Sequence, residues 1–190
     1  MELLFVLECE LLVSVRHVCC RSVRGVEKMA KAKEIKTNAM RILEREKIPF
    51  QQYTYECDEF VDGIQIADKL SLPYEKVYKT LVTVGSSKNY FVFVIPIAEE
   101  LDLKKAARSV GEKSVAMIHV KEINSITGYI RGGCTAIGMK KQYVTRLDQS
   151  AKQQETIIVS GGRIGSQIEL KPEDLLKASR GEMADLLAEH

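Results

Sequence analysis

The hydrophobic positions of this chain follow a strand-like pattern most clearly in residues 77–97. Residues 77–84 and 90–97 are rich in β-branched and aromatic side chains, and the polar residues 85–89 (Gly-Ser-Ser-Lys-Asn) separate them. Two such runs around a short turn predict a β-hairpin. The second run is almost continuously apolar, which is typical of a strand that is covered on both faces.

Helical patterns flank this hairpin on both sides. Thr37 is placed to cap a helix that ends before Pro49, and Asp62 and Asp102 are placed to cap two further helices. The face of the second of these helices that we expect to point inward holds Ile64, Ala67 and Leu70.

Shorter elements complete the pattern. Strand-like runs lie at residues 50–56, 115–119, 143–147, 156–159 and 167–170. A turn or two of helix is expected at residues 121–127, Pro172 suits the first position of a helix through Ala178, and an amphipathic stretch at residues 183–188 closes the chain. Because no regular crossover helices separate the strands, the pattern predicts one α+β domain with a mixed, strongly curved sheet and helices around it.

The first 28 residues differ from the rest. Residues 1–9 are apolar but carry two acids, and no basic residue precedes them, so they do not fit a secretory signal. They are also too short and too charged to span a bilayer, whereas residues 29–33 (Met-Ala-Lys-Ala-Lys) resemble an ordinary cytoplasmic start. We therefore predict an extension at residues 1–28 outside the fold, a domain at residues 29–190, a cytoplasmic location and no membrane contact.

Composition narrows the function classes. A chain of 190 residues with 45% hydrophobic residues is long enough for one well-buried core. The formal net charge of +2 excludes a protein that coats nucleic acid through bulk charge, so any such contact would be local. The five cysteines form neither a disulfide framework nor a Cys-x-x-Cys pair. Reduced thiols, and no metal or cofactor, are the expectation.

Two glycine-rich segments are the main irregularity in the pattern. Residues 128–138, which we call the first glycine loop, contain four of the twelve glycines, and residues 159–165, the second glycine loop, follow one strand later. Each contains an arginine, Arg131 or Arg163. A tight turn between strands explains either loop alone. Together they suggest two walls of one cleft that tolerates an anion.

Lys79 lies in the middle of the first strand of the hairpin. A lysine in a sheet that is covered on both sides is costly to bury unless its ammonium is paired or lines a polar cavity. The alternative is an edge strand from which the side chain reaches water. The first reading predicts an ammonium that points at an anionic or carbonyl group of a ligand.

Other candidate residues leave alternatives open. Tyr53 and Tyr55 share one face of their strand and either stack on a ligand or fill the core. Ser160 either presents its hydroxyl to a ligand or ends a strand. Cys134 with His119 is a conceivable nucleophile and base. Neither glycine loop has the spacing of a nucleophile elbow, a P-loop or a dinucleotide site.

Six motifs, taken together, carry a resemblance to a known family. They are Thr37-Asn38-Ala39-Met40, Tyr78-Lys79-Thr80-Leu81-Val82, Leu101-Asp102-Leu103-Lys104-Lys105-Ala106-Ala107, Thr127-Gly128-Tyr129 through Gly133, Gly138-Met139-Lys140-Lys141 and Val159-Ser160-Gly161-Gly162. In this order they closely resemble the YbaK-like aminoacyl-tRNA deacylases, which are relatives of the editing domain inserted in bacterial prolyl-tRNA synthetases. The resemblance covers residues 36–187, and residues 56–63 depart from the better-known members, which are richer in His, Asn and Pro there.

The resemblance implies a curved, mixed sheet that closes toward a barrel, and it implies trans-editing, the hydrolysis of a wrong amino acid from tRNA. The typical substrate is Cys-tRNA(Pro). The family's essential strand lysine matches Lys79. Its substrate-binding positions match Tyr55, Thr80, Gly132 and Ser160, and we expect the adjoining Gly133 and Gly161 to bind the substrate as well. The backbone N–H groups of Gly132 and Gly133 are placed to stabilise the developing negative charge.

The implied partners are the acceptor end of a mischarged tRNA and, for selectivity, prolyl-tRNA synthetase. In the family the attacking group is water or the thiol of the substrate, so the resemblance implies no cofactor, metal or Ser–His pair. Two alternatives remain. One is a non-catalytic module that binds an aminoacyl-nucleotide or a protein, and the other is a thiol enzyme that depends on Cys134.

Overall fold

The computed structural model of the protein describes residues 36–56 and 62–188. The chain divides into two compact units, Met1–Glu34 and Ile35–His190, and the description concerns the second unit alone. The predicted extension at residues 1–28 lies outside the described residues, so the domain boundary there stays a prediction.

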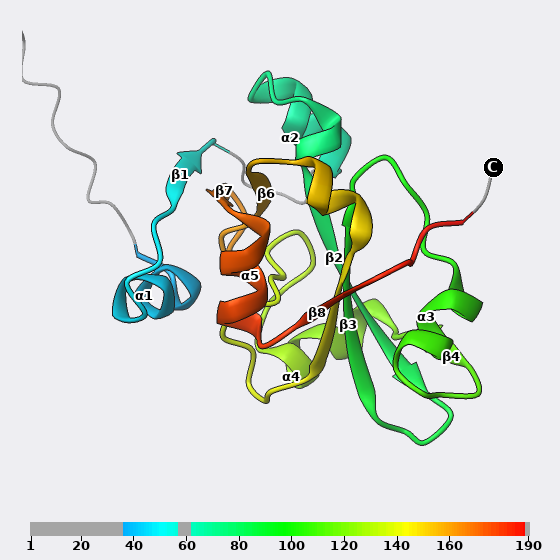
Figure 1. Ribbon diagram of the computed structural model, residues 1–190. Helices are drawn as coiled ribbons and strands as arrows, with labels where there is room; N and C mark the ends of the chain where they lie inside the picture. Colours follow the sequence, from blue (N-terminus) through cyan, green and yellow to red (C-terminus); the bar gives the residue numbers. More distant parts are fainter. Residues whose placement is uncertain (1–35, 57–61, 189–190) are drawn as a thin grey trace, which may run out of the picture. The chain divides into compact units, whose positions relative to one another are not determined.

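The second unit combines short helices with strands (Figure 1). Its α-helices are α1 (Asn38–Arg45), α2 (Gly63–Lys69), α3 (Leu103–Ser109), α4 (Ile123–Thr127) and α5 (Pro172–Ser179). Its strands are β1 (Gln51–Thr54), β2 (Tyr78–Gly85), β3 (Tyr90–Pro96), β4 (Val115–Met117), β5 (Val144–Asp148), β6 (Ile157–Ser160), β7 (Ser166–Leu170) and β8 (Glu182–Ala184). Short 3-10 turns lie at Tyr74–Lys76, Val120–Glu122 and Gln149–Gln153. None of the described helices has the length and apolar character needed to cross a membrane.

The predicted helix starts are confirmed by their capping bonds. The side chains of Thr37, Asp62 and Asp102 each accept a hydrogen bond from a backbone N–H in the first turn of the helix that follows. The predicted inward face of α2 is partly wrong. Ile66 and Ala67 are buried, whereas Ile64 is 39% exposed.

The strands form a mixed arrangement, as the sequence pattern predicts. A five-stranded sheet has the order β4-β2-β3-β5-β8, and a three-stranded sheet has the order β1-β7-β6. The predicted hairpin of β2 and β3 is antiparallel, whereas β5 pairs parallel to both β3 and β8. A bridge between Val77 and Ile158 links β2 to β6, and thus one sheet to the other. The α+β class with a mixed sheet is therefore confirmed, and the closing amphipathic stretch supplies β8.

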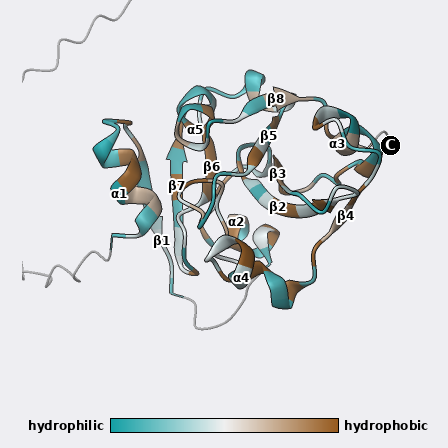
Figure 2. Cartoon of the chain, turned by 90° about the horizontal axis from the view of Figure 1, so that it is seen from below, coloured by the Kyte–Doolittle hydropathy of each residue, from teal (hydrophilic) through white to brown (hydrophobic). Residues whose placement is uncertain are grey.

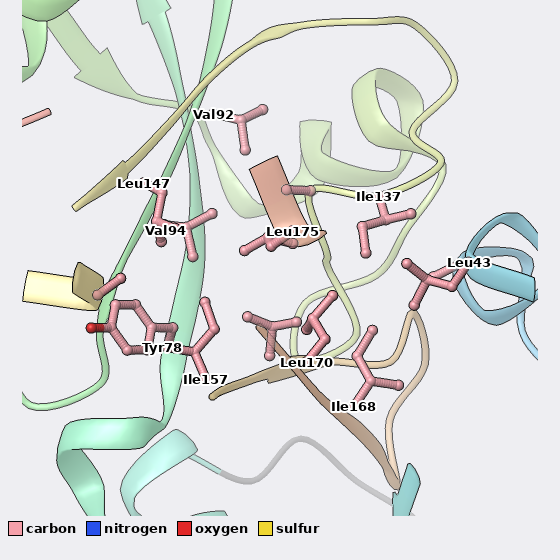
Figure 3. Close-up of a cluster of buried hydrophobic side chains, with 14 of the residues drawn as sticks. Leu43, Tyr78, Val92, Val94, Ile137, Leu147, Ile157, Ile168, Leu170 and Leu175 are labelled. Atoms are coloured by element: carbon pink, nitrogen blue, oxygen red, sulfur yellow. The ribbon is translucent and has the colours of Figure 1, made fainter. Parts of the chain in front are cut away.

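Strand β3 is the centre of the core because both of its faces are buried, as predicted. Val92 and Val94 belong to one hydrophobic cluster, and Phe91, Phe93 and Ile95 belong to a second. Figure 3 shows the first cluster, in which side chains from β3, β5, β6, β7, α1 and α5 converge. Full burial of one such side chain contributes about 1.5–3 kcal/mol, so β3 fixes the position of its neighbour β2.

Helix α1 ties the two glycine loops to the core. The Thr37 hydroxyl donates a 2.5 Å hydrogen bond to the carbonyl of Gly161, and the Asn38 amide donates a 3.1 Å bond to the carbonyl of Gly138. The helix carries hydrophobic and hydrophilic residues, as Figure 2 shows, and its Leu43 reaches the cluster in Figure 3. One short helix therefore holds both loops at a fixed separation.

We expect replacement of Thr37 by alanine to lower the free energy of unfolding by about 1–2 kcal/mol, because it removes both the α1 cap and the bond to Gly161. Denaturant unfolding measures the change. Thr37→Ser keeps the hydroxyl, so its free energy of unfolding should fall much less. Equal losses in the two variants would show that the hydroxyl is not the stabilising group.

Candidate functional site

The candidate site lies where β2 changes neighbours. Val77, just before β2, forms a bridge to β6, and the pairing of β2 with β4 begins at Thr83. Among the described strands, none pairs with Lys79–Leu81 on this edge. A cavity of about 340 Å³ opens there. It is lined by Asp62, Gly63, Ile66, Val77, Tyr78, Lys79, Thr80, Leu81, Val82, Ile97, Met117, Ile118, Val120, Ile123, Arg131, Gly132, Cys134, Ser160 and Gln167.

Lys79 is the cation that β2 contributes to this cavity. The side chain is half-buried, and its Nζ donates a 3.0 Å hydrogen bond to the carbonyl of Ile97. Burial lowers the pKa of Lys79, and the carboxylates of Asp62, Glu100 and Glu99 oppose that shift. Of the two sequence readings, the structure therefore favours a lysine that lines a cavity, next to carboxylates that support its charge.

The two glycine loops form neighbouring walls of the cavity, as the sequence predicts. Arg131 and Gly132 line it from the first loop, and Ser160 lines it from the second. The loops touch at Gly133, where a Cβ would lie 2.9 Å from the Arg163 Cα. Only a residue without a side chain allows two backbones to approach so closely.

Gly133 and Gly161 shape the loops and are not among the residues that line the cavity. The Gly133 N–H donates to the carbonyl of Ile130 at 3.0 Å, and the Gly161 N–H donates to the carbonyl of Ser166 at 2.9 Å. The expectation that these two glycines contact the substrate therefore does not fit the structure. Gly132 has φ of 81°, and its N–H takes part in no such loop bond among the described residues.

The remaining predicted positions divide between cavity and periphery. Thr80 lines the cavity beside Lys79, and the Ser160 hydroxyl accepts a long, 3.4 Å bond from Gly162. Tyr55 is not a lining residue. Its N–H donates to the Gly165 carbonyl, and its ring centroid lies 5.9 Å from the Lys69 ammonium.

Two polar lining residues were not selected from the sequence. Asp62 was recognised only as a helix cap, and it stands at the exposed rim of the cavity. Gln167 is 5% exposed and lines the cavity from β7. The sequence contains no signal for Gln167, because Gln167 and Glu169 alternate with Ile168 and Leu170 as in any strand with one polar face.

Cys134 lines the cavity but is poorly suited to act as a nucleophile. Burial raises the pKa of its thiol to about 11, and a hydrogen bond with Thr127 opposes this only in part. His119 is exposed and is not a lining residue. A Cys134–His119 pair is therefore not formed. Within the described ranges, no group of three or more His, Cys, Asp or Glu side chains is arranged to hold a metal ion.

We expect Cys134 to react about 100-fold more slowly with iodoacetamide at pH 7 than an unperturbed thiol, because a pKa of about 11 in place of 9.0 lowers the thiolate fraction by that factor. Peptide mapping by mass spectrometry separates Cys134 from the other cysteines. Rapid modification at neutral pH would contradict the inert thiol.

We expect Gly133→Ala to push the glycine loops apart, because the added Cβ would meet backbone atoms of Arg163. Alkylation of Cys134 should then become faster, and the free energy of unfolding should fall by about 1–3 kcal/mol. Gly111→Ala is a control for backbone strain without a clash, since Gly111 has open space around it but a left-handed φ of 72°; it should also lower the free energy of unfolding, yet leave Cys134 protected. If both variants left Cys134 equally protected, the loop contact would not be what encloses it.

Comparisons with known proteins identify the family. The model of the aminoacyl-tRNA editing domain matches residues 62–178. A protein of Enterococcus faecalis that is provisionally named Cys-tRNA(Pro)/Cys-tRNA(Cys) deacylase EbsC is 46% identical over 160 residues, which is 83% of this chain and 98% of that protein.

Two solved structures share the fold at low identity. One is described as a candidate trans-editing enzyme for prolyl-tRNA synthetase, with a TM-score of 0.67, 21% identity and coverage of 80% of this chain and 99% of that one. The other is a hypothetical protein with a TM-score of 0.69, 19% identity and coverage of 77% and 96%. With the family match and the Enterococcus relative, these findings lead to one conclusion: this chain belongs to the aminoacyl-tRNA editing domain family.

Proposed function

We propose that this protein is a trans-editing deacylase that hydrolyses the ester bond of mischarged aminoacyl-tRNA, with Cys-tRNA(Pro) as its most suitable substrate. The proposal rests on family membership and on the relative whose name carries this activity. The observation that supports it in the structure is the half-buried Lys79 ammonium in a largely apolar cavity between two glycine loops.

The ester of an aminoacyl-tRNA is already activated, so catalysis needs positioning and stabilisation of negative charge more than a strong protein nucleophile. Either water attacks the carbonyl carbon and gives free cysteine, or the thiol of the substrate's own cysteine attacks it and gives a cyclic thioester that water then opens. In both routes the attacking group loses a proton. The C–O bond to the ribose then breaks, and the ribose hydroxyl leaves with a proton. This route agrees with the protonated state of Cys134.

Lys79 is the proposed catalytic residue. Its ammonium either polarises the ester carbonyl or holds the phosphate of the terminal nucleotide, and both roles need a positive charge at the edge of β2. Gly132 lines the cavity from the first glycine loop, and its N–H is a donor that can stabilise the oxyanion that forms on the carbonyl. Thr80 and Ser160 supply hydroxyls for the polar groups of the substrate.

The apolar part of the lining supports a small side chain on the aminoacyl group. This apolar part of the lining includes Val77, Ile97 and Ile118. A cavity of about 340 Å³ is large enough for an aminoacyl group and part of the terminal ribose, and too small for much of the tRNA. The remaining contacts to the acceptor end therefore lie on the surface around the cavity.

Docking on prolyl-tRNA synthetase belongs to the same proposal. A net charge of +2 gives little long-range attraction for tRNA, so selection of the correct tRNA would benefit from the synthetase. A cytoplasmic location follows from the proposed substrate, since aminoacyl-tRNA is made and used there.

We expect Lys79→Met to lower the rate of cysteine release from Cys-tRNA(Pro) by about 100-fold or more, because the charge is lost while the hydrocarbon stem still packs. Lys79→Ala should lose as much activity. The measurement is the fraction of tRNA that stays acylated over time, at matched protein stability. Cys134→Ser is the control that should retain activity.

Three other outcomes would change the conclusion. Activity lost in Cys134→Ser and kept in Lys79→Met would indicate a thiol enzyme. Retained activity in both variants would remove Lys79 from catalysis. If the unmutated protein left Cys-tRNA(Pro) and other mischarged tRNAs intact, a non-catalytic binding module would be the better reading.

A further inference from the structure

Asp62 contributes a carboxylate to a cavity in which the other charged lining residues are cations. Among the described lining residues it is the acidic one, and it shares the lining with Lys79 and Arg131. As the cap of α2, the Asp62 carboxylate accepts only a weak hydrogen bond. The Ile64 N–H lies 3.4 Å from Asp62 Oδ2, which is longer than the usual range of N–H···O bonds. The carboxylate therefore keeps acceptor capacity at the rim of the cavity.

The position of Asp62 relative to Lys79 is fixed through Ile97. A Cβ on Gly63 would lie 2.1 Å from the Ile97 Cδ1, so the start of α2 packs directly against the Ile97 side chain. The carbonyl of the same Ile97 accepts the hydrogen bond from Lys79 Nζ. Figure 1 shows α2 beside the start of β2, the strand that contains Lys79. The Lys79 ammonium and Gly63, the residue next to Asp62, therefore both lie against Ile97.

The two charges also act on each other. Among the carboxylates that oppose the burial-induced fall in the pKa of Lys79, Asp62 has the largest influence. The cavity thus contains a positive and a negative group near one another, with apolar side chains around them. A ligand that fits this pair has a positively charged group for the carboxylate and, close to it, a negatively polarised atom for the ammonium.

An aminoacyl ester has this polarity, because its protonated α-amine is bonded to the carbon next to the ester carbonyl. The cations Lys79 and Arg131 would repel an ammonium unless a carboxylate offsets them. We infer that the Asp62 carboxylate binds the α-ammonium of the aminoacyl group while Lys79 faces the carbonyl side. This inference rests on the proposed function and adds a specificity-determining residue to it.

The inference has a consequence for substrate choice. In peptidyl-tRNA or N-acylated aminoacyl-tRNA the α-nitrogen is an uncharged amide, which offers Asp62 no cation. Such substrates lose a charge-assisted hydrogen bond to Asp62. Asp62 would thus direct the enzyme toward free aminoacyl esters and spare growing peptides.

The test compares two substrates in two proteins. Cys-tRNA(Pro) and N-acetyl-Cys-tRNA(Pro) with a free thiol are given to the unmutated protein and to Asp62→Asn. Asparagine caps helices about as well as aspartate, so α2 should persist, and thermal unfolding verifies this. Asp62→Ser is a second neutral variant that can still cap the helix.

We expect the unmutated protein to favour the free amine over the acetylated substrate by about 10-fold in kcat/KM. In Asp62→Asn and Asp62→Ser this ratio should fall about 10-fold, toward the ratio that the intrinsic reactivities of the two esters set, through loss of activity on the free amine alone. A structural role, or an effect through the pKa of Lys79, would lower both activities and leave the ratio unchanged.

The inference is overturned by an unchanged ratio in the two variants, and by a ratio near one in the unmutated protein. In both cases the unmutated protein still deacylates Cys-tRNA(Pro), so the proposed function survives. If the unmutated protein hydrolyses no mischarged tRNA, the proposed function fails and the role of Asp62 fails with it.

Discussion

The site depends on one constraint, the change of partner along the edge of β2. The other edge of this strand is fully paired with β3, whose two faces are buried in separate clusters. On the opposite edge, two different elements are neighbours of the strand: Val77 forms a bridge to β6, and the pairing with β4 starts at Thr83. The stretch between them must stay open, since neither neighbour reaches it. A cavity at Lys79 is thus a product of sheet topology, and α2 and the glycine loops close its sides.

The glycine loops keep this opening at a defined width. Gly133 lets the first loop lie against the Arg163 backbone, while Thr37 and Asn38 of α1 bond to the carbonyls of Gly161 and Gly138. The Tyr129 hydroxyl donates a 2.7 Å bond to the Ile137 carbonyl, which closes the first loop on itself. These loops therefore lack regular secondary structure but are held by specific bonds, as a site that positions a reactive ester requires.

The sequence was sufficient for the hairpin, the helix starts and the place of Lys79 in a cavity, because each of these has a local signal. A lysine in an apolar strand is such a signal, and so are the capping residues Thr37, Asp62 and Asp102. It was not sufficient for Asp62 in the cavity, since a capping aspartate looks the same wherever its helix points. Nor could it separate Gly132 from Gly133, because the difference is a bond to the Ile130 carbonyl. That bond depends on the folded path of the loop.

Burial shifts the pKa values of Cys134 and Lys79 for the same reason but in opposite directions. It disfavours the charged form of each group, so it raises the pKa of the Cys134 thiol and lowers that of the Lys79 ammonium. Asp62, Glu99 and Glu100 oppose the shift at Lys79, whereas a hydrogen bond with Thr127 is what opposes it at Cys134. Carboxylates stabilise an ammonium, and they would destabilise a thiolate. The charge distribution around this cavity therefore favours lysine over cysteine as its ionised group, which is the charge that the proposed catalysis by positioning requires.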